Sequence, residues 1–394
     1  MPFAAALSTD ATTSAAVADV CDRVRADLPG QPDLTLAFFT PHHEAAGIAQ
    51  EVASRLAPRA ALGCIAEAVI GGGREIELQP AVSLWAARWP RPVRLTPFHL
   101  TLERTADGPS LLGWPDALGG EGGREAFAPA RSAVLLLGDP FSFPTEAFLA
   151  RVNEEAPGLP VLGGMASGIR GTGQARLVQD GEVRTRGAVG LMLEGDLGLR
   201  WIVSQGCRPI GQHMVVTKAE DNVIQELGGL TPFEQLRRLW DTLSADEQRL
   251  FQQGLHIGRV LNEYRGEFQR GDFLVRNVVG LERDSGALVI TDHVRVGQTV
   301  QFHVRDAASA DEDLHALLQL DLNAHERRPA GGLVFSCNGR GTRLFGAPDH
   351  DAAAVRQEAG PIPLAGFFAM GELGPVGGQN FIHGFTASVA LFEE

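Results

Sequence analysis

Apolar and polar residues follow one another along the chain in two periods, one typical of strands and one typical of helices. Residues 34–40 (LTLAFFT) form a continuous apolar run with the length of a buried strand. The Thr-Pro pair at its end predicts a helix start, because a threonine hydroxyl can cap a helix and proline suits the first position. Apolar residues then recur at helical spacing from Ala45 to Leu56. We therefore predict a strand, a turn and a helix over residues 34–56.

A similar order recurs further along the chain. Residues 133–140 (AVLLLGDP) predict a strand and residues 145–156 predict a helix. Three segments, each after a strand and a helix, align as Gly-x-x-Ala-x-(Gly/Ala), which indicates an internal duplication with a third relative in the C-terminal part. Chance is the alternative, because the chain contains 47 glycines. The aligned segments are LGCIAEA (62–68), LGGMASG (162–168) and AGFFAMG (365–371).

The remaining pattern sets the expected domains. An amphipathic helix between Thr13 and Leu28 should pack on the first domain as an appendage. Two capping boxes, TPFE at 231–234 and SADE at 244–247, predict two short helices in succession. The predicted fold class is α+β, with two related domains whose mixed, largely antiparallel sheets are flanked by helices, and an internal repeat. The predicted boundaries are 1–30 for the N-terminal helix, 31–217 for the first domain and 218–394 for the second.

Composition and charge narrow the class of protein. Of the 394 residues, 44% are apolar and 21% are charged, which is ordinary for a soluble globular protein. No apolar run approaches the roughly 18 residues of a membrane-spanning helix, and the first thirty residues lack a secretory signal, so we predict a cytoplasmic protein without membrane insertion. The net charge of −14 disfavours a nucleic-acid partner, which would require clustered basic residues.

The sequence lacks the motifs of several common types of binding site. The single lysine, Lys218, does not follow a glycine, so there is no phosphate-binding Gly-Lys loop. Adjacent residues on a helix point apart, so neither His42-His43-Glu44 nor residues 349–351 predict a metal site. The cysteines are widely spaced, with no Cys-x-x-Cys pair, which disfavours thiolate zinc and a disulfide framework. They are Cys21, Cys64, Cys207 and Cys337.

Reactive and hydrogen-bonding side chains gather where apolar strands of the last sixty residues end in glycine. Loops that leave buried strands can place polar groups over an apolar floor, so we predict a small-molecule site there. Arg340 can hold a carboxylate through two parallel hydrogen bonds, Glu372 can receive an ammonium group, and Asn338 offers a donor and an acceptor. The structural alternative is an internal Arg340–Glu372 pair. The candidate ligand-binding residues are Cys337, Asn338, Arg340, Glu372, His383 and Thr386, with Cys64, Met165 and Ser167 from the earlier aligned segments.

Catalysis is a weaker hypothesis than ligand binding. Cys337 could act as a nucleophile with His383 as its base, but a buried cysteine is more often a small apolar residue. The segment GMASG (164–168) has its serine one place too late for a nucleophile elbow. The segment GRGTRLFG (339–346) has Leu344 where a dinucleotide-binding loop needs its third glycine. We therefore predict no catalytic residue.

At this point the residues resemble a known family. LGCIAEAVIGGGREIE, GDPFSFP, VLGGMASG and SQGCRPIG resemble the N-terminal FIST domain. FLVRNVVG, GQTVQFHVRDA, GGLVFSCNGRG and PLAGFFAMGELGPVGGQNFIHGFTASVALF resemble the C-terminal FIST domain. Together the resemblance covers residues 31–394.

The resemblance implies an intracellular sensory module of bacterial signal transduction that binds a small ligand, such as an amino acid or derivative. Family members couple to histidine kinases or cyclic-nucleotide enzymes, so we expect a separate output protein of this kind as partner. Some bacterial members are reported to bind haem and sense nitric oxide, which makes a haem sensor the second hypothesis, with His213, His303 and His383 as axial candidates. A hydrolase that uses Cys337 is the third. No other cofactor is expected.

Overall fold

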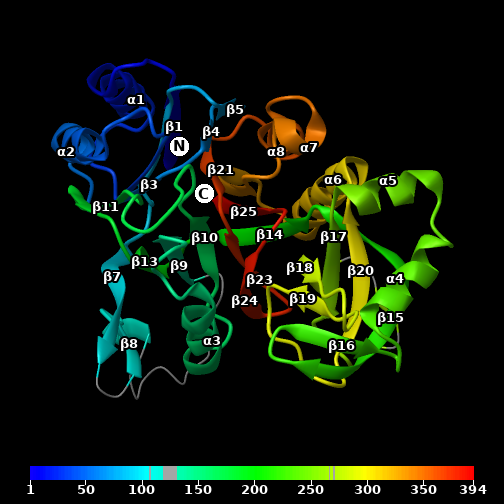
Figure 1. The fold of residues 1–394 in the computed structure, drawn as a ribbon. Coiled ribbons are helices and arrows are strands. Elements are labelled where there is room, and N and C mark those ends of the chain that lie inside the picture. Colours follow the sequence, from blue (N-terminus) through cyan, green and yellow to red (C-terminus); the bar gives the residue numbers. More distant parts are fainter. Residues whose placement is uncertain (106–107, 119–130, 266, 269–270) are drawn as a thin grey trace. The chain divides into compact units, whose positions relative to one another are not determined.

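The computed structural model describes residues 1–105, 108–118, 131–265, 267–268 and 271–394. Within them the chain forms two compact units (Figure 1). The domain boundary expected after residue 217 falls inside strand β15 (Cys207–Glu220). The compact units divide the chain at other positions. The first unit contains Met1–Val203, Leu314–Ile382 and Thr386–Glu394, and the second contains Ser204–Asp313 and His383–Phe385.

Three sheets in the first unit confirm the α+β class and the internal repeat. Each repeat runs from a strand through a helix to a second strand that is parallel to the first, and a later strand pairs antiparallel with the first. We name these the first, second and third repeats. Their parallel strands and helices are β2 (Leu34–Phe39), α2 (Ala45–Leu56) and β3 (Ala60–Ile65); β9 (Ser132–Gly138), α3 (Thr145–Glu155) and β10 (Val161–Met165); and β21 (Pro329–Cys337), α7 (Thr342–Phe345), α8 (His350–Ala359) and β22 (Leu364–Ala369).

Each sheet is completed by a hairpin from another repeat. Hairpin β11–β12 of the second repeat extends β3 of the first, β23–β24 of the third extends β10 of the second, and β4–β5 of the first extends β22 of the third. This cyclic exchange places residues that are distant in sequence side by side. The other strands of the three sheets are β1 (Phe3–Ser8), β4 (Ala68–Gly71), β5 (Arg74–Glu77), β6 (Val82–Ala87), β7 (Val93–Thr105), β8 (Gly108–Leu112), β11 (Leu177–Gln179), β12 (Glu182–Arg184), β13 (Ala188–Gly195), β14 (Leu199–Gln205), β23 (Glu372–Val376), β24 (Gln379–His383) and β25 (Thr386–Glu393).

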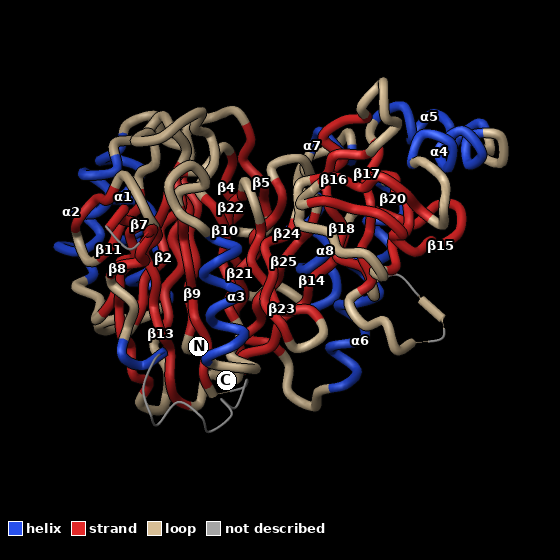
Figure 2. Tube along the Cα trace, turned by 60° about the horizontal axis from the view of Figure 1, so that its bottom comes forward, coloured by secondary structure: helices blue, strands red, loops and turns tan. Residues whose placement is uncertain are grey.

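The interior of the first unit follows the two-residue period of its strands. Leu135 and Leu137 of β9 belong to a central core to which all three sheets contribute. Leu136, which lies between them in sequence, packs instead with Phe148 of α3 in an outer cluster. Figures 1 and 2 accordingly place α3 beside β9 and β10.

One glycine in each repeat is required by the close approach of two strands. At each position a Cβ atom would collide with the carbonyl oxygen of the residue opposite in the parallel ladder. The aligned glycines therefore share one packing role, which is evidence against a chance match. The distances from such a Cβ to the oxygen are 2.3 Å for Gly63 and Ala37, 2.0 Å for Gly163 and Leu136, and 1.8 Å for Gly366 and Val334.

The N-terminal segment is an integral part of the first sheet, which corrects the expected appendage. Strand β1 pairs antiparallel with β6, and Phe3 stacks on Trp85 with ring centroids 5.2 Å apart. The predicted helix is present as α1 (Thr13–Asp27), and it buries Val17 and Val20 in the central core. The strand escaped prediction because FAAALS is short and rich in alanine, which has a low strand propensity.

The second unit contains a closed antiparallel barrel with its own apolar core. Both predicted capping boxes are present, since Thr231 Oγ1 accepts from Glu234 N, and Ser244 Oγ accepts from Glu247 N, at 3.3 Å each. The barrel strands are β15, β16 (Val223–Leu227), β17 (Leu255–Val260), β18 (Phe273–Leu281), β19 (Leu288–Ile290) and β20 (Thr299–Arg305), and the helices are α4 (Pro232–Trp240), α5 (Ala245–Gln253) and α6 (Ala307–Ala324), which continues into the first unit.

Candidate functional site at the end of the third repeat

The first strand of each repeat is followed or ended by a polar side chain at the same structural position. Thr40, Asp139 and Cys337 each lie three residues beyond the strand residue that pairs with the repeat's glycine. Thr40 and Asp139 are buried and bind main-chain N–H groups: Thr40 Oγ1 accepts from Ala81 N, next to β6, at 2.9 Å, and Asp139 Oδ1 accepts from Phe141 N of its own turn at 3.1 Å. Cys337 instead adjoins a group of buried ionisable residues. We name this group the third-repeat cluster: Cys337, Arg340, Asp351, Glu372 and Glu75.

A buried ion pair forms the centre of the third-repeat cluster. Arg340 and Asp351 are 0% and 1% exposed. Arg340 Nε and Nη2 donate to Asp351 Oδ2 and Oδ1 at 2.8 Å each, the bidentate geometry that suits a guanidinium and a carboxylate. Burial by itself would raise the pKa of the Asp351 carboxyl. The charge of Arg340 and hydrogen bonds from His350, Arg340 and Ser336 nevertheless hold that pKa below its usual range.

This geometry gives Arg340 a different role from the two that the sequence suggested. The fork of its guanidinium faces a carboxylate of the chain itself, and that carboxylate belongs to Asp351 of α8, not to Glu372. Arg340 is also fully buried, which is unfavourable for gripping a ligand carboxylate from solution. We therefore assign Arg340 to the support of the cluster.

Glu75 reaches the cluster because of the hairpin exchange. It lies on β5 of the first repeat, is 4% exposed, and accepts a hydrogen bond from Ala352 N of α8 at 3.0 Å. Burial, together with the negative charge of Asp351, raises the pKa of the Glu75 carboxyl to about 8. The side chain is therefore mainly protonated at neutral pH.

Glu372, like Glu75, has one carboxyl oxygen that is left unsatisfied by the described residues. It is 0% exposed at the start of β23. Thr386 N donates to its Oε2 at 3.1 Å and the Cys337 thiol adds a weak hydrogen bond to the carboxyl, but Oε1 has no partner among the described residues. Burial raises the pKa of this carboxyl well above its ordinary value. Counted in sequence, the residues six places after the aligned glycine in the first two repeats are Val69, in β4, and Ile169, in the loop before β11.

Cys337 is the group of the cluster that keeps the most contact with solvent, at 8% exposed. Gly339 N donates to its sulfur at 3.4 Å, which fixes the thiol at the strand end. Asn338 follows it, with its amide oxygen 3.9 Å from the sulfur and its backbone N–H bonded to the Ala369 oxygen at 2.9 Å. The thiol thus lies beside a carboxyl, an amide N–H and an amide side chain.

Two of the predicted residues from the earlier aligned segments, Ser167 and Met165, form hydrogen bonds between the repeats. Ser167 Oγ accepts from Glu67 N at 2.8 Å and donates to the Phe368 carbonyl oxygen, so it ties all three segments together. Met165 continues this junction, because its N–H donates to the Gly371 oxygen at 2.9 Å. Cys64 lies in the interior of its sheet at 0% exposed, where burial raises the pKa of the thiol well above its ordinary value.

The two remaining predicted residues belong to different compact units. Thr386 lies in the first unit at 1% exposed and contacts the cluster through its bond to Glu372. His383 is grouped with the second unit and is 5% exposed. The structure therefore joins four predicted residues in one neighbourhood, namely Cys337, Asn338, Glu372 and Thr386, with Arg340 behind them.

Sequence reasoning missed Asp351 and Glu75 as members of the cluster. Residues 349–351 attracted attention only as metal ligands, although a carboxylate in the first turn of a helix can also hold an arginine. Glu75 gave no signal, because it is 276 residues away from Asp351 and meets it only through the exchange of a hairpin. A contact of that kind cannot be read from local sequence.

The surroundings of the ionisable residues bear on the metal and haem hypotheses. Within the described ranges, no group of three or more His, Cys, Asp or Glu residues could hold a metal ion. His303 is 2% exposed, and a Cβ on Gly258 would lie 2.3 Å from its Cε1 atom. His213 is an exposed residue beside Phe268. A haem ligand among these histidines stays a prediction. Of the helices described, none has the length and apolar character needed to cross a membrane.

Comparison with protein families identifies two regions of the chain. The FIST N domain model matches residues 33–230, and the FIST C domain model matches residues 232–375. The chain belongs to the FIST family. FIST domains are known as sensory domains in signal transduction.

Curated relatives extend the match over the full chain. The chain is 41% identical over 395 residues to "Uncharacterized protein Rv0628c" of Mycobacterium tuberculosis (strain ATCC 25618 / H37Rv), with 100% of both chains covered. It is also 41% identical over 380 residues to "Uncharacterized protein Mb0898c" of Mycobacterium bovis, with 96% of this chain and 95% of the relative covered. The printed names state no activity, so they support the family and not a ligand.

Proposed function

We propose that this protein is a sensory protein that recognises a small molecule with an amino group, such as an amino acid or derivative, at Glu372 and Cys337. The observation that carries the proposal is Glu372 Oε1, a buried oxygen without a partner among the described residues. Leaving such a group unsatisfied costs about 1–3 kcal/mol. An aliphatic side chain, as at Val69 and Ile169, would avoid that cost, so stability alone does not account for a glutamate here.

An ammonium group suits the chemistry of Glu372. Burial raises the pKa of this carboxyl and so favours its protonated form, whereas an arriving cation favours the charged form. Binding would therefore release the proton of Glu372 and form a charge-assisted hydrogen bond. The charge of Arg340 is already compensated by Asp351, so it opposes a cationic ligand only weakly.

Cys337 and Asn338 supply the remaining polar contacts in this proposal. The thiol is held by the Gly339 amide and keeps some exposure, so it can contact a ligand without rearrangement of the backbone. Asn338 has an intermediate exposure and an amide that both donates and accepts. A ligand carboxylate would meet this amide, because the guanidinium of Arg340 is engaged.

A thermal-shift screen of the twenty amino acids and simple amines tests the proposal. A ligand at one hundred times its Kd stabilises the folded protein by about 2.7 kcal/mol, which raises Tm measurably. We expect at least one hit with the unmodified protein and its loss in Glu372→Gln. Glu154→Gln, an exposed glutamate on α3, is the matched control and should keep the hit. A panel without hits, or a hit that survives in Glu372→Gln, would contradict the proposal.

The output partner stays a prediction of the family resemblance. We propose a histidine kinase or a cyclic-nucleotide enzyme in that role. Co-purification of either class with the tagged protein, dependent on the ligand found in the screen, would support it.

A further inference from the structure

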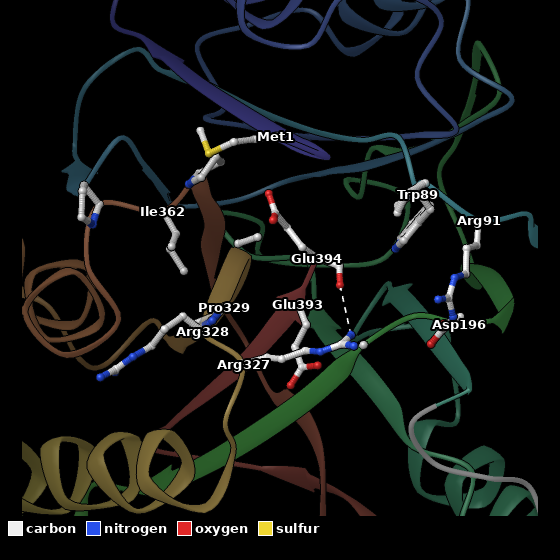
Figure 3. A pocket seen from close by; sticks show the side chains of 15 residues that line it. Met1, Trp89, Arg91, Asp196, Arg327, Arg328, Pro329, Ile362, Glu393 and Glu394 are labelled. Carbon is white, nitrogen blue, oxygen red and sulfur yellow. Dashed lines mark hydrogen bonds and ion pairs between the residues drawn. The ribbon is translucent and has the colours of Figure 1, made fainter.

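A second place for a ligand lies at the other end of strand β21. A cavity of about 760 Å³ is lined there by residues that precede or follow strands of the first unit (Figure 3). Pro329 begins β21 at this cavity, and Cys337 ends it at the third-repeat cluster. Eight steps along an extended strand span roughly 26 Å. The cavity is therefore separate from the site proposed above, and its use does not depend on that proposal.

Six charged side chains line the cavity, and three of them are held in ion pairs, whereas Arg327, Arg328 and Glu394 are the other three. Arg91 forms an ion pair with Asp196, and Glu393 Oε1 lies 3.0 Å from Arg200 Nη1. The described contact of the Arg327 guanidinium is a long hydrogen bond of 3.4 Å to the main-chain oxygen of Glu394 (Figure 3). A guanidinium has five N–H donors, so Arg327 retains donors for an anion.

Trp89 provides an unused donor in the same wall. Its side chain lines the cavity but is only 7% exposed, and its Nε1, which is itself buried, has no hydrogen-bond partner among the described residues. A buried indole N–H usually finds a partner, so a missing one is an exception to explain. The ring is held by Phe3 and Phe392, with centroids 6.2 Å and 6.4 Å away. Trp89 is therefore a fixed donor that needs an acceptor.

The rest of the wall offers an apolar surface. Ile362 and the rings of Pro329 and Pro363 line the cavity. Rigid apolar groups of this kind suit a flat hydrocarbon body, whereas the donors of Arg327 and Trp89 suit an oxyanion. The volume falls within the range of typical small-molecule sites.

We propose that this cavity binds a carboxylate with a flat apolar or aromatic body. Arg327 and the Trp89 Nε1–H hold the carboxylate oxygens, and Ile362 with the neighbouring proline rings packs against the body. The ligand class differs from that of the third-repeat cluster, which favours an amine. The chain thus has two sites of opposite charge preference at the two ends of one strand.

Isothermal titration of the full chain with two matched probes tests this site. The first probe is 1-naphthoate, and the second is naphthalen-1-ylmethanol, which has the same ring system without the charge. We expect 1-naphthoate to bind at one site per chain and about tenfold more tightly than the alcohol, as a charge-assisted bond requires. Failure of 1-naphthoate to bind saturably would overturn the proposal.

Variants locate the binding within the chain. Arg327→Gln should weaken 1-naphthoate about tenfold and leave the alcohol unchanged. Trp89→Phe keeps the apolar contact but removes the N–H, and should weaken 1-naphthoate about threefold. Arg170→Gln, an exposed arginine elsewhere in the first unit, is the control and should have no effect. Unchanged affinity in Arg327→Gln would contradict the assignment. Because Arg327 is exposed, its variant should fold, and an unchanged Tm would verify this.

Discussion

The first two repeats and the third repeat share one framework but bury different side chains at the end of their first strands. In the first two, Thr40 and Asp139 bind main-chain N–H groups, and aliphatic residues occupy the position six places after the aligned glycine. In the third, that position is Glu372, and Arg340 and Asp351 lie nearby as a buried ion pair. The framework explains the glycines, but it does not require these charges. Perturbed, buried ionisable groups of this kind are typical of functional sites.

Among the variants that test this difference between the repeats, removal of one partner of the buried ion pair should reduce the free energy of unfolding the most. Asp351→Asn leaves the Arg340 charge buried and uncompensated, so we expect a loss of about 4 kcal/mol in the free energy of unfolding. Urea denaturation followed by circular dichroism measures it. Asp116→Asn, an exposed residue, is the control.

The double variant Arg340→Met with Asp351→Leu sharpens the same test. It removes both charges together, so most of the lost stability should return. A cost below about 1 kcal/mol for Asp351→Asn would mean that the pair does not support the third repeat.

The pH dependence of stability should show the second-largest effect. The pKa of Glu75 is about 8 in the folded protein and 4.5 for an ordinary glutamate, so between these values the folded state holds a proton that the unfolded state has released. The free energy of unfolding therefore falls as pH rises through this window, by about 3 kcal/mol from Glu75 between pH 5 and pH 8.

Glu75→Gln isolates this contribution. The variant cannot ionise at this position, so its stability relative to the unmodified protein should increase by about 3 kcal/mol between pH 5 and pH 8. Urea denaturation at each pH gives the difference. A constant difference across this range would show that Glu75 is not held protonated by the third-repeat cluster.

The aligned glycines test what the three repeats have in common. Gly63→Ala, Gly163→Ala and Gly366→Ala should each cost roughly 1–3 kcal/mol, because the added methyl collides with a carbonyl oxygen. Gly366→Ala should cost the most, since its contact is the shortest at 1.8 Å. Gly171→Ala is the control, because nothing lies within 4 Å of its Cβ position. Equal stability of all four variants in urea denaturation would argue against a shared packing role.

Glu372→Gln should have the smallest effect on stability. A glutamine has no charge, like the protonated carboxyl, and its oxygen can still accept from Thr386 N. We therefore expect a change below about 1 kcal/mol in urea denaturation. A loss of several kcal/mol would instead indicate that Glu372 is needed for the fold, as the aliphatic residues are in the other repeats.

The sequence was sufficient for the parts of the fold that depend on local pattern. Strand β2 and helix α2 follow from apolar periodicity and turn residues, and both capping boxes of the second unit are present as predicted. The aligned glycines also disclosed the internal repeat. The hairpin exchange was not predictable, because the choice between a strand's own hairpin and that of another repeat depends on tertiary packing.

Of the candidate site, only the residues at the ends of strands could be predicted from the sequence. Cys337 and Glu372 were predicted because both stand at glycine-bounded ends of apolar strands. The ion-pair partner of Arg340 was not predicted, because the sequence contains several carboxylates that could pair with it. Only the folded structure shows that the partner is Asp351. Strand β1 was missed for the simpler reason that its composition is weak for a strand.

The most direct test of the central claim is the number of protons released when an amine ligand from the screen binds. Isothermal titration at pH 7 in phosphate and in Tris buffer gives this number from the difference in apparent enthalpy. We predict about one proton released by the unmodified protein and none by Glu372→Gln. The same enthalpy in both buffers for the unmodified protein, or an equal proton release by the two proteins, would contradict the claim that Glu372 is the group that recognises the ligand.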